Sequence, residues 1–392
     1  MSAAIDFDVL VIGAGIAGAS VAHFLAPYAR VGLLERESQP GYHTTGRSAA
    51  MFMESYGPAQ VRALTRASRA FLATPVDGES PLISPRGALY VARAEQADEL
   101  RALHERLRSE GTRAQLLQTA GARALVPVLR DEAARLALID DDACDIDVDR
   151  LHQRFLRGAR RHGAILVCNA DVRAIAFAHG SWSVSTPTQR FTAPLLVNAA
   201  GAWADVVAAL AGVAPLGLQP CRRSAFTFAP PAGVDVRGWP CVASIDESFY
   251  FKPEAGVLLG SPANADPVPA HDVVAEELDI ATGIERIEQN TTLTIRRPLR
   301  TWAGLRSFVP DGALVGGFDD SVPGFFWCCG QGGYGIQTSP AMGQACAARL
   351  LERPLPAHIA DQGLADTELA PRRVVGASRS AGLPGFASGQ TR

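Results

Sequence analysis

The stretch DFDVLVIGAGIAGASVAHFLAPYARVGLLER, residues 6–36, constrains the fold more than any other part of this 392-residue chain. Residues 8–12 form a continuous apolar run, which is typical of a strand buried on both faces of a parallel sheet. A GxGxxG sequence follows and opens a helical pattern, and a second apolar run over 31–34 leads to an acidic residue. Such glycines allow a tight turn, close approach of a pyrophosphate and close helix–strand packing, while the acid accepts hydrogen bonds from a ribose. The predicted dinucleotide contacts are Gly13, Gly15, Ile16, Ala17, Gly18, Glu35 and Arg36.

The acid at the end of the second run disfavours a 2′-phosphate, which leaves FAD and NAD as candidates. A nicotinamide enzyme would usually continue with alternating strands and helices, but here the polar loop QPGYHTTGRSAA (residues 39–50) follows. Its hydroxyls, backbone N–H groups and arginine suit a second pass along a pyrophosphate and a flavin ring. Two later segments, APLLVNAAGAWADVVAAL and GFFWCCGQGGYGIQTSPAMGQACAARLLE, place small residues between an apolar strand and a helix. The second helix could direct its positive end at a flavin pyrimidine ring.

We therefore predict FAD as the cofactor. The further predicted FAD contacts are Thr44, Thr45, Gly46, Arg47, Ser48, Ala49, Ala50, Ala200, Gly201, Trp203, Gly304, Gly332, Gly333, Tyr334, Gly335, Ile336 and Gln337.

The composition argues against several other classes of protein. The formal net charge of −3 provides no electrostatic footprint for nucleic acid. Seven scattered cysteines without a CxxC predict reduced thiols and no metal site. The apolar run over 9–26 contains three glycines and a histidine, so it predicts a strand, a turn and a helix rather than a transmembrane segment. A cytoplasmic location is expected, with peripheral attachment to the inner membrane left open.

Ten further segments carry a resemblance to a known family: GYHTTGRSAA, QVRALTRASRAF, LVNAAGAWAD, RRSAFTFAPP, DESFYFKP, GSPANADPV, EELDIATG, TLTIRRP, TWAGLRSFV and QGGYGIQTS. On these segments the chain resembles the D-amino acid oxidase/glycine oxidase superfamily of flavoenzymes, and within it bacterial FAD-dependent D-arginine dehydrogenases most, from about residue 6 to residue 373. The resemblance implies an α/β fold in which a Rossmann-type FAD-binding lobe is interleaved with an α+β substrate lobe built on a mostly antiparallel sheet. The implied segments are 1–80, 146–214 and 310–373 for the FAD lobe and 81–145 and 215–309 for the substrate lobe.

Local patterns predict several elements within that frame. Helical periodicity covers 59–72 and 94–108, and 89–92 is typical of a strand. Asp147 or Asp149 is the predicted N-cap of a helix that ends at Gly163, and a turn is expected at 179–180. A Pro/Gly/Asp stretch over 74–81 predicts a crossing between the lobes. The polar, Gly- and Ser-rich residues 374–392 predict a disordered tail.

An α-amino acid substrate needs a clamp for its carboxylate, and arginine is suited to this because its planar fork binds carboxylate through two parallel hydrogen bonds. The candidates are Arg223 and Arg306, with the Tyr250 hydroxyl as a further donor. The resemblance implies that Tyr56 is a lid residue and that the carbonyl of Gly333 lies near the substrate amine. The implied reaction is hydride transfer from Cα to N5 of FAD, which yields an imino acid that water converts to a 2-oxo acid and ammonia.

The resemblance also predicts the substrate side chain. In the D-arginine dehydrogenases, the position of Met51 is a histidine and that of Ala88 is the glutamate that binds the guanidinium. Both polar groups are absent here, so Met51, Met53 and Ala88 predict a pocket for apolar or bulky D-amino acids rather than D-arginine. Whether Glu54 replaces the missing acid is left open.

Two alternative functions remain at this point. The first is an FAD oxidase of glycine, sarcosine or another secondary amine, and the second is an FAD-binding protein whose active site has decayed. Relatives with covalent FAD carry a cysteine after the basic residue near Arg306, but Ser307 occupies that position, so non-covalent FAD is expected. The electron acceptor is open between a quinone, a dye-like carrier and oxygen.

Overall fold

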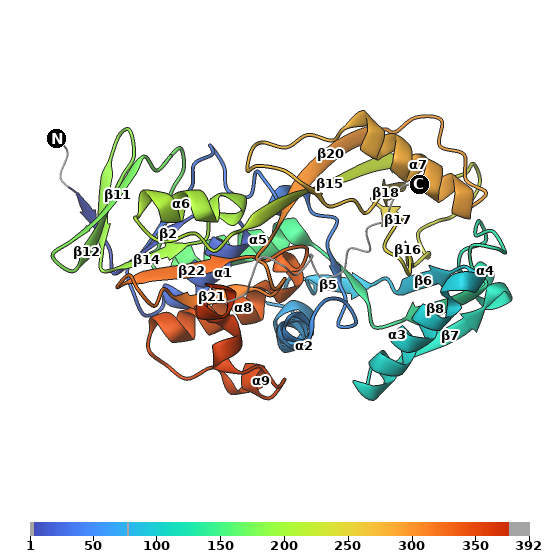
Figure 1. Cartoon of the computed structure of the whole chain (residues 1–392), viewed down its shortest axis with the longest axis horizontal. Helices are drawn as coiled ribbons and strands as arrows, with labels where there is room; N and C mark the ends of the chain where they lie inside the picture. Colours follow the sequence, from blue (N-terminus) through green and yellow to red (C-terminus); the bar gives the residue numbers. More distant parts are fainter. Residues whose placement is uncertain (1–3, 77, 376–392) are drawn as a thin grey trace.

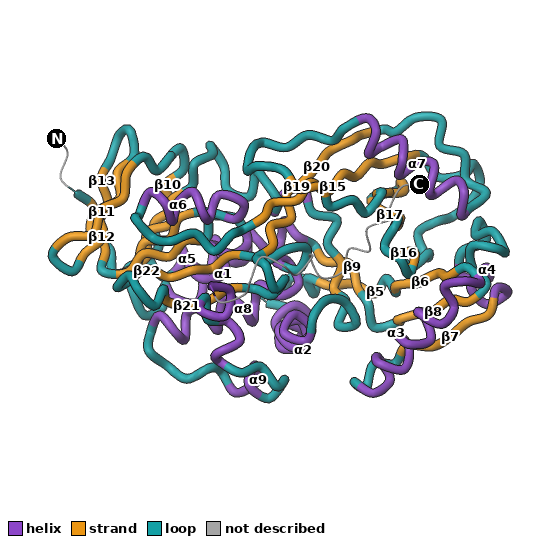
Figure 2. Tube along the Cα trace, viewed as in Figure 1, coloured by secondary structure: helices purple, strands orange, loops and turns teal. Residues whose placement is uncertain are grey.

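The computed structural model describes residues 4–76 and 78–375 and shows two lobes, one around a parallel sheet and one around a large antiparallel sheet (Figure 1). The predicted tail falls mostly outside the described residues, which end within the short helix α10 (Arg372–Val375). Strands from the beginning, middle and end of the chain pair within one sheet, as the predicted interleaving requires, and the tube in Figure 2 shows the strands of both lobes in orange among purple helices.

The first lobe is built on a six-stranded sheet in the order β10-β3-β2-β14-β22-β21, in which only β21 runs antiparallel to its neighbour. Its strands are β2 (Val9–Ile12), β3 (Val31–Leu34), β10 (Ile165–Val167), β14 (Leu195–Asn198), β21 (Val315–Phe318) and β22 (Phe325–Cys329). All residues of β2 and β3 are buried, as expected for central strands of a parallel sheet. The two predicted apolar runs are thereby confirmed as neighbouring strands.

Helices and a second small sheet cover this central sheet on its two faces. The helix cluster consists of α1 (Ile16–Leu25), α2 (Ala59–Ala73), α5 (Val148–Arg161) and α8 (Gly335–Leu350), with the short α9 (Ala357–Ala360) beside α2. The other face packs against α6 (Ala204–Leu210) and a four-stranded sheet in the order β1-β13-β12-β11. That sheet contains β1 (Ile5–Asp6), β11 (Ala174–Ala178), β12 (Ser181–Ser185) and β13 (Arg190–Ala193).

The second lobe is a nine-stranded sheet in the order β19-β15-β18-β17-β16-β6-β8-β7, with β20 added beside β15. Its pairs are antiparallel except β16 with β6, which confirms the predicted mostly antiparallel sheet. The strands are β6 (Ala88–Ala92), β7 (Ala114–Gln118), β8 (Leu136–Asp140), β15 (Gln219–Phe228), β16 (Cys241–Ser244), β17 (Tyr250–Glu254), β18 (Val257–Ser261), β19 (Asp266–Pro267) and β20 (Arg300–Phe308). The helices are α3 (Ala97–Ser109), α4 (Thr119–Leu125) and α7 (Glu277–Asn290).

A three-stranded sheet lies between the two lobes and contains strands from segments that were predicted for different lobes. The residue boundaries predicted for the two lobes therefore stay a prediction. This sheet pairs β9 (Cys144–Ile146) with both β4 (Met51–Phe52) and β5 (Ile83–Pro85). Local predictions are confirmed nearby: the Asp147 carboxylate caps α5 by accepting from the Arg150 N–H at 3.0 Å. The His179–Gly180 turn has φ angles of 53° and 77°.

None of the helices in the described part of the chain combines the length and apolar character needed to cross a membrane. All seven cysteines lie within the described residues, and each is a free thiol.

A partly buried histidine in the helix cluster leads to a prediction for pH-dependent stability. His23 lies on α1 among the rings of Phe24, Phe71 and Phe155, and its Nδ1 has no partner among the described residues. Burial, reinforced by the nearby Arg154, lowers the pKa of His23 to about 4. Because this folded-state pKa is below the unfolded value, the neutral ring favours folding above about pH 6.5, and this contribution falls as the pH drops towards 4.

We expect urea unfolding to show about 3 kcal/mol of stability lost through His23 between pH 7 and pH 4. The His23→Gln variant cannot take up this proton and should lose correspondingly less. Equal losses in both proteins over that range would contradict the assignment.

Candidate active site

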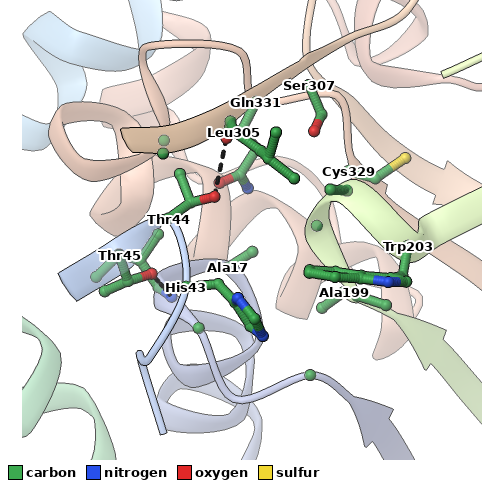
Figure 3. A pocket seen from close by; sticks show the side chains of 18 of the residues that line it. Ala17, His43, Thr44, Thr45, Ala199, Trp203, Leu305, Ser307, Cys329 and Gln331 are labelled. Carbon is green, nitrogen blue, oxygen red and sulfur yellow. Dashed lines mark hydrogen bonds between the residues drawn. The ribbon is translucent and has the colours of Figure 1, made fainter. Parts of the chain in front are cut away.

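One cavity gathers residues from both lobes around the carboxyl ends of β2 and β14 (Figure 3). Figure 3 shows Thr44 and Thr45 of the loop after β3 among Ala17 of α1, Trp203, and Leu305 of β20. The predicted FAD contacts that line it are Gly13, Gly15, Ile16, Ala17, Glu35, Arg36, Thr44, Thr45, Arg47, Ser48, Ala49, Ala200, Gly201, Trp203, Gly304, Gly332, Gly333, Gly335 and Ile336. Segments separated by more than 300 positions therefore line one cavity.

The glycine-rich turn has the geometry that a pyrophosphate site needs. Gly13 has a φ of 99°, and a Cβ there would lie 2.5 Å from the carbonyl oxygen of Ala199, so only glycine fits. A Cβ on Gly18 would lie 1.9 Å from the Gly13 oxygen, which shows how closely α1 packs on the turn. Glu35 is buried and accepts the Ala14 N–H at 2.9 Å, which fixes its carboxylate beside the turn.

Five predicted FAD contacts lie outside the lining of the cavity: Gly18, Gly46, Ala50, Tyr334 and Gln337. Gly18 and Gly46 serve packing and turn geometry instead, since the Gly46 N–H bonds to the Gly41 oxygen at 2.8 Å. Gln337 is buried in the first turn of α8, and its Oε1 accepts the Met53 N–H at 3.0 Å. Its Nε2 has no partner within the described residues.

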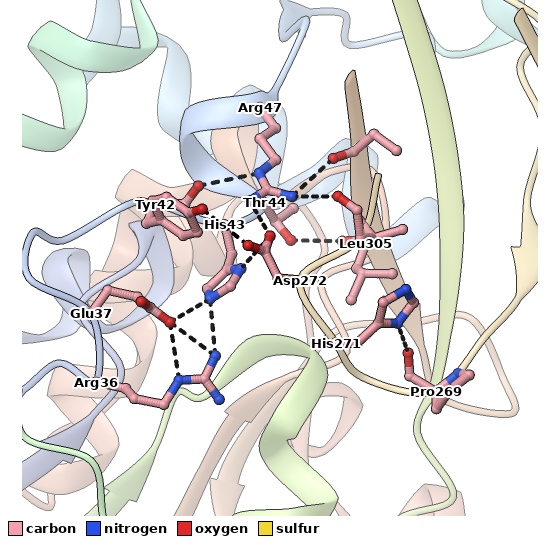
Figure 4. A network of polar contacts seen from close by, with 12 residues as sticks. Arg36, Glu37, Tyr42, His43, Thr44, Arg47, Pro269, His271, Asp272 and Leu305 are labelled. Carbon is pink, nitrogen blue, oxygen red and sulfur yellow. Dashed lines mark hydrogen bonds and ion pairs between the residues drawn. The ribbon is translucent and has the colours of Figure 1, made fainter. Parts of the chain in front are cut away.

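The loop after β3 is tied to the substrate lobe by a network of polar contacts (Figure 4). The Arg47 guanidinium bonds to Asp272 and to the Val273 carbonyl at 2.7 Å, and the Tyr42 hydroxyl donates to Asp272 at 3.0 Å. The Thr44 hydroxyl donates to the Leu305 carbonyl at 2.8 Å. The Arg47 guanidinium is thus paired with the Asp272 carboxylate. The phosphate-binding role predicted for Arg47 stays a prediction.

The two candidate carboxylate-binding arginines lie on one face of the β15–β20 pair. Arg223 is opposite Gly304 in the register and Cys221 is opposite Arg306, so the two arginines are diagonal neighbours. Both line the cavity, together with Tyr250 and Gly333. Within the described chain, neither arginine has a carboxylate at ion-pair distance. Burial and the facing guanidinium of Arg306 lower the pKa of Arg223 to about 10, so both remain charged at neutral pH.

Gly333 is held directly against Arg306. A Cβ at this position would lie 2.9 Å from the guanidinium carbon of Arg306. Any side chain at Gly333 would therefore force the Arg306 guanidinium to shift.

The remaining predicted pocket residues lie beside this cavity rather than in its lining. The ring of Tyr56 lies 5.3 Å from that of Tyr334, and burial raises the Tyr56 pKa above its ordinary value. Met51 and Met53 pack against one cluster of apolar residues that includes the buried Ala88. The three residues share one apolar cluster outside the lining of the cavity, so their role as a wall of the substrate pocket stays a prediction.

Glu54 does not face this wall. Its carboxylate pairs with Arg69 of α2 at 2.5 Å, which leaves it committed to another partner.

Several functional candidates escaped the sequence reasoning. His43 and Gln331 also line the cavity, and His43 packs against Trp203 with a centroid distance of 4.6 Å. Asn264, Asp272 and Asp279 bind residues of the site from the substrate lobe. Their partners lie 41 to 225 positions away, so no local pattern marks them.

Curated relatives resemble the chain over most of its length. FAD-dependent oxidoreductase domain-containing protein 1 from Bos taurus is 25% identical over 88% of this chain and 81% of its own length. Mitochondrial sarcosine dehydrogenase from Homo sapiens is 24% identical over 87% of this chain and 39% of its own length.

Solved structures share the fold. Glycine oxidase from Geobacillus kaustophilus has a TM-score of 0.78 and 23% identity, covering 89% of this chain and 96% of that one. L-proline dehydrogenase from P. horikoshii has a TM-score of 0.78 and 20% identity, covering 95% and 98%. The family model for DAO, FAD dependent oxidoreductase, matches residues 8–349, and the chain therefore belongs to this family of FAD-dependent oxidoreductases.

Proposed function

We propose that the chain oxidatively deaminates D-amino acids with apolar or bulky side chains. The observation that carries this proposal is the pair formed by the buried Arg223 and the half-buried Arg306, which face one cavity without a carboxylate at ion-pair distance among the described residues. Two shielded cations that have no carboxylate at ion-pair distance in the described chain are costly, so the site favours an anionic ligand. A substrate carboxylate would neutralise them through charge-assisted hydrogen bonds.

The residues around the arginines define the roles in the reaction. The carboxylate is bound by the arginines and by the Tyr250 hydroxyl, while the Gly333 carbonyl accepts a hydrogen bond from the substrate amine. When bound, FAD supplies the acceptor for the hydride that leaves Cα. The amine loses a proton as the C=N bond forms, and water then converts the imino acid to a 2-oxo acid and ammonia. Tyr56 covers the reacting atoms and limits the access of water.

The apolar wall supports the preference for the side chain. Met51 and Met53 pack with Ala88, where the D-arginine dehydrogenases that the sequence resembles carry an acid. Glu54 cannot replace that acid while it pairs with Arg69. A guanidinium placed against this wall would lose its hydration, and the carboxylate of Asp140, which is opposite Ala88 in the β6–β8 register, already accepts from the Ser55 hydroxyl at 2.7 Å. The D configuration rests on the same sequence resemblance, so both enantiomers belong in the test.

Glycine, or a secondary amine such as sarcosine, is the alternative substrate. Glycine oxidase and sarcosine dehydrogenase, two proteins to which this chain is similar, carry the names of such small amines. The paired arginines fit those substrates equally well, because glycine and sarcosine also carry a carboxylate. A decayed site is disfavoured, since Arg223, Tyr250 and Arg306 all line the same cavity.

The test is an anaerobic reaction of the FAD-loaded protein with D-Met, D-Phe, D-Arg, their L-enantiomers, glycine and sarcosine. We expect the visible flavin band to bleach rapidly with D-Met and D-Phe only. Bleaching by sarcosine or glycine alone would establish the alternative, and bleaching by D-Arg would point to Glu247, whose carboxylate interacts electrostatically with both arginines. The absence of bleaching with every amine would contradict catalysis.

A change at Ala88 tests the wall directly. The Ala88→Glu variant should raise kcat/KM for D-Arg about 30-fold, since a close buried charge pair is worth roughly 2 kcal/mol. The matched Ala88→Gln variant has the same size without the charge and should leave D-Arg a poor substrate. Similar gains in both variants would contradict the electrostatic explanation.

A further inference from the structure

Two adjacent arginines on β15 point to opposite faces of the sheet, as neighbouring strand residues must. Arg223 faces the cavity. Arg222 faces α7 and forms ion pairs with Asp279 at 2.8 Å, with Asp266 at 3.3 Å and with Glu276. On one face of the strand, Arg223 thus has no carboxylate at ion-pair distance in the described chain. On the opposite face, the neighbouring Arg222 is paired with three carboxylates.

The two faces are linked through Asn264, in the loop between β18 and β19. The backbone carbonyl of Asn264 accepts the Nε–H of Arg223. The side chain of the same residue accepts the Ser224 N–H at 2.9 Å and donates to Asp279 at 3.1 Å and to Asp266 at 2.7 Å. Ala263, directly before it, has a φ of 51°, a left-handed conformation that non-glycine residues adopt only when their surroundings impose it.

Asp279 is the centre of this arrangement. A single oxygen, Oδ2, accepts from Arg222 Nε, from the Ser224 hydroxyl at 2.6 Å and from the amide of Asn264. The side chain is only 11% exposed, so these contacts are shielded from water. Asp279 thus fixes both the strand and the loop whose carbonyl holds Arg223.

We propose that Asp279 and Asn264 are positioning residues for Arg223 in the carboxylate clamp. Because the Asn264 carbonyl occupies the Nε–H, the guanidinium has its two terminal nitrogens free for the substrate and meets the carboxylate end-on. A planar fork held in this way loses little further rotational freedom on binding, which favours a tight complex. This inference rests on the proposed function, since it requires a substrate that carries a carboxylate.

The test uses the FAD-loaded enzyme and the Asp279→Asn variant. We expect KM for D-Met to rise about tenfold with kcat nearly unchanged, which corresponds to about 1.4 kcal/mol of lost binding. The dissociation constant of phenylacetate, a carboxylate that cannot be oxidised in this way, should rise by the same factor when followed by the perturbation of the flavin spectrum. Asn264→Ala retains the carbonyl but loses the side-chain bonds, and it should show the same split between KM and kcat.

Glu276→Gln is the matched control, because Glu276 binds Arg222 without contacting Asn264. It should leave KM and the phenylacetate constant unchanged. An equal rise in this control, or unchanged constants in Asp279→Asn and Asn264→Ala, would overturn the inference. If Arg306→Met also fails to weaken phenylacetate binding, the proposed function itself falls. If Arg306→Met weakens it and Asp279→Asn does not, only the positioning role is lost.

Discussion

Replacing Arg306 with methionine is expected to lower kcat/KM for D-Met by about 10²- to 10³-fold, since truncating one partner of a buried charge pair costs roughly 3–4 kcal/mol. Methionine retains much of the volume of the arginine stem but cannot bind a carboxylate. The loss should appear in steady-state kinetics and in the affinity for phenylacetate. Arg223 remains in the variant, so some carboxylate binding persists.

The Arg300→Met variant is the control for this experiment. Arg300 lies on the same strand, β20, but is exposed at its far end. The Arg300→Met variant should keep the kcat/KM for D-Met and the phenylacetate affinity of the unmodified enzyme. If Arg306→Met bleached with D-Met as fast as the unmodified enzyme, the carboxylate clamp would be assigned to the wrong residue.

Replacing Gly15 with valine is expected to weaken FAD binding by at least about 100-fold, because the side chain would occupy the place where a pyrophosphate approaches the backbone. The φ of Gly15 is −69°, so valine can adopt the local backbone conformation. A Cβ there would lie 3.2 Å from the Thr45 hydroxyl, a contact that small movements can relieve. The variant should therefore fold and fail mainly in binding.

Titration of the apoprotein with FAD, followed by quenching of flavin fluorescence, measures this effect. The Gly238→Val variant is the control, since a Cβ at Gly238 meets nothing within 4 Å. Thermal melting of both apoproteins separates lost binding from lost folding. Unchanged FAD affinity in a folded Gly15→Val protein would remove the glycine-rich turn from the cofactor site.

The nucleotide-binding half of the site could be predicted because its signals are local. An apolar run, a GxGxxG sequence and an acid within 31 residues dictate a buried strand, a turn and a helix N-terminus, whatever the rest of the chain does. The strands at Val9–Ile12 and Val31–Leu34 and the cap at Asp147 depend on the same short-range rules. Tertiary contacts reinforce these elements without changing them.

Charged side chains followed a different rule. Glu54 and Arg47 both sit in segments predicted to face ligands, yet Glu54 pairs with Arg69 and Arg47 with Asp272. The sequence indicates which segment carries a charged residue, but the partner of its charge is the opposite charge that the fold places next to it. Arg47 finds that partner 225 positions away.

The sequence by itself determined the class of fold and the cofactor and, through resemblance, predicted the residues that we propose for the carboxylate clamp. Only the tertiary structure decided which arginines have no carboxylate partner and what holds them. Arg222 and Arg223 are indistinguishable as a dipeptide, but the pleat of β15 turns one towards three carboxylates of the 264–279 region and the other into the cavity. The physical reason is that the cost of a buried charge depends on what surrounds it, and these surroundings are assembled only when distant strands pair.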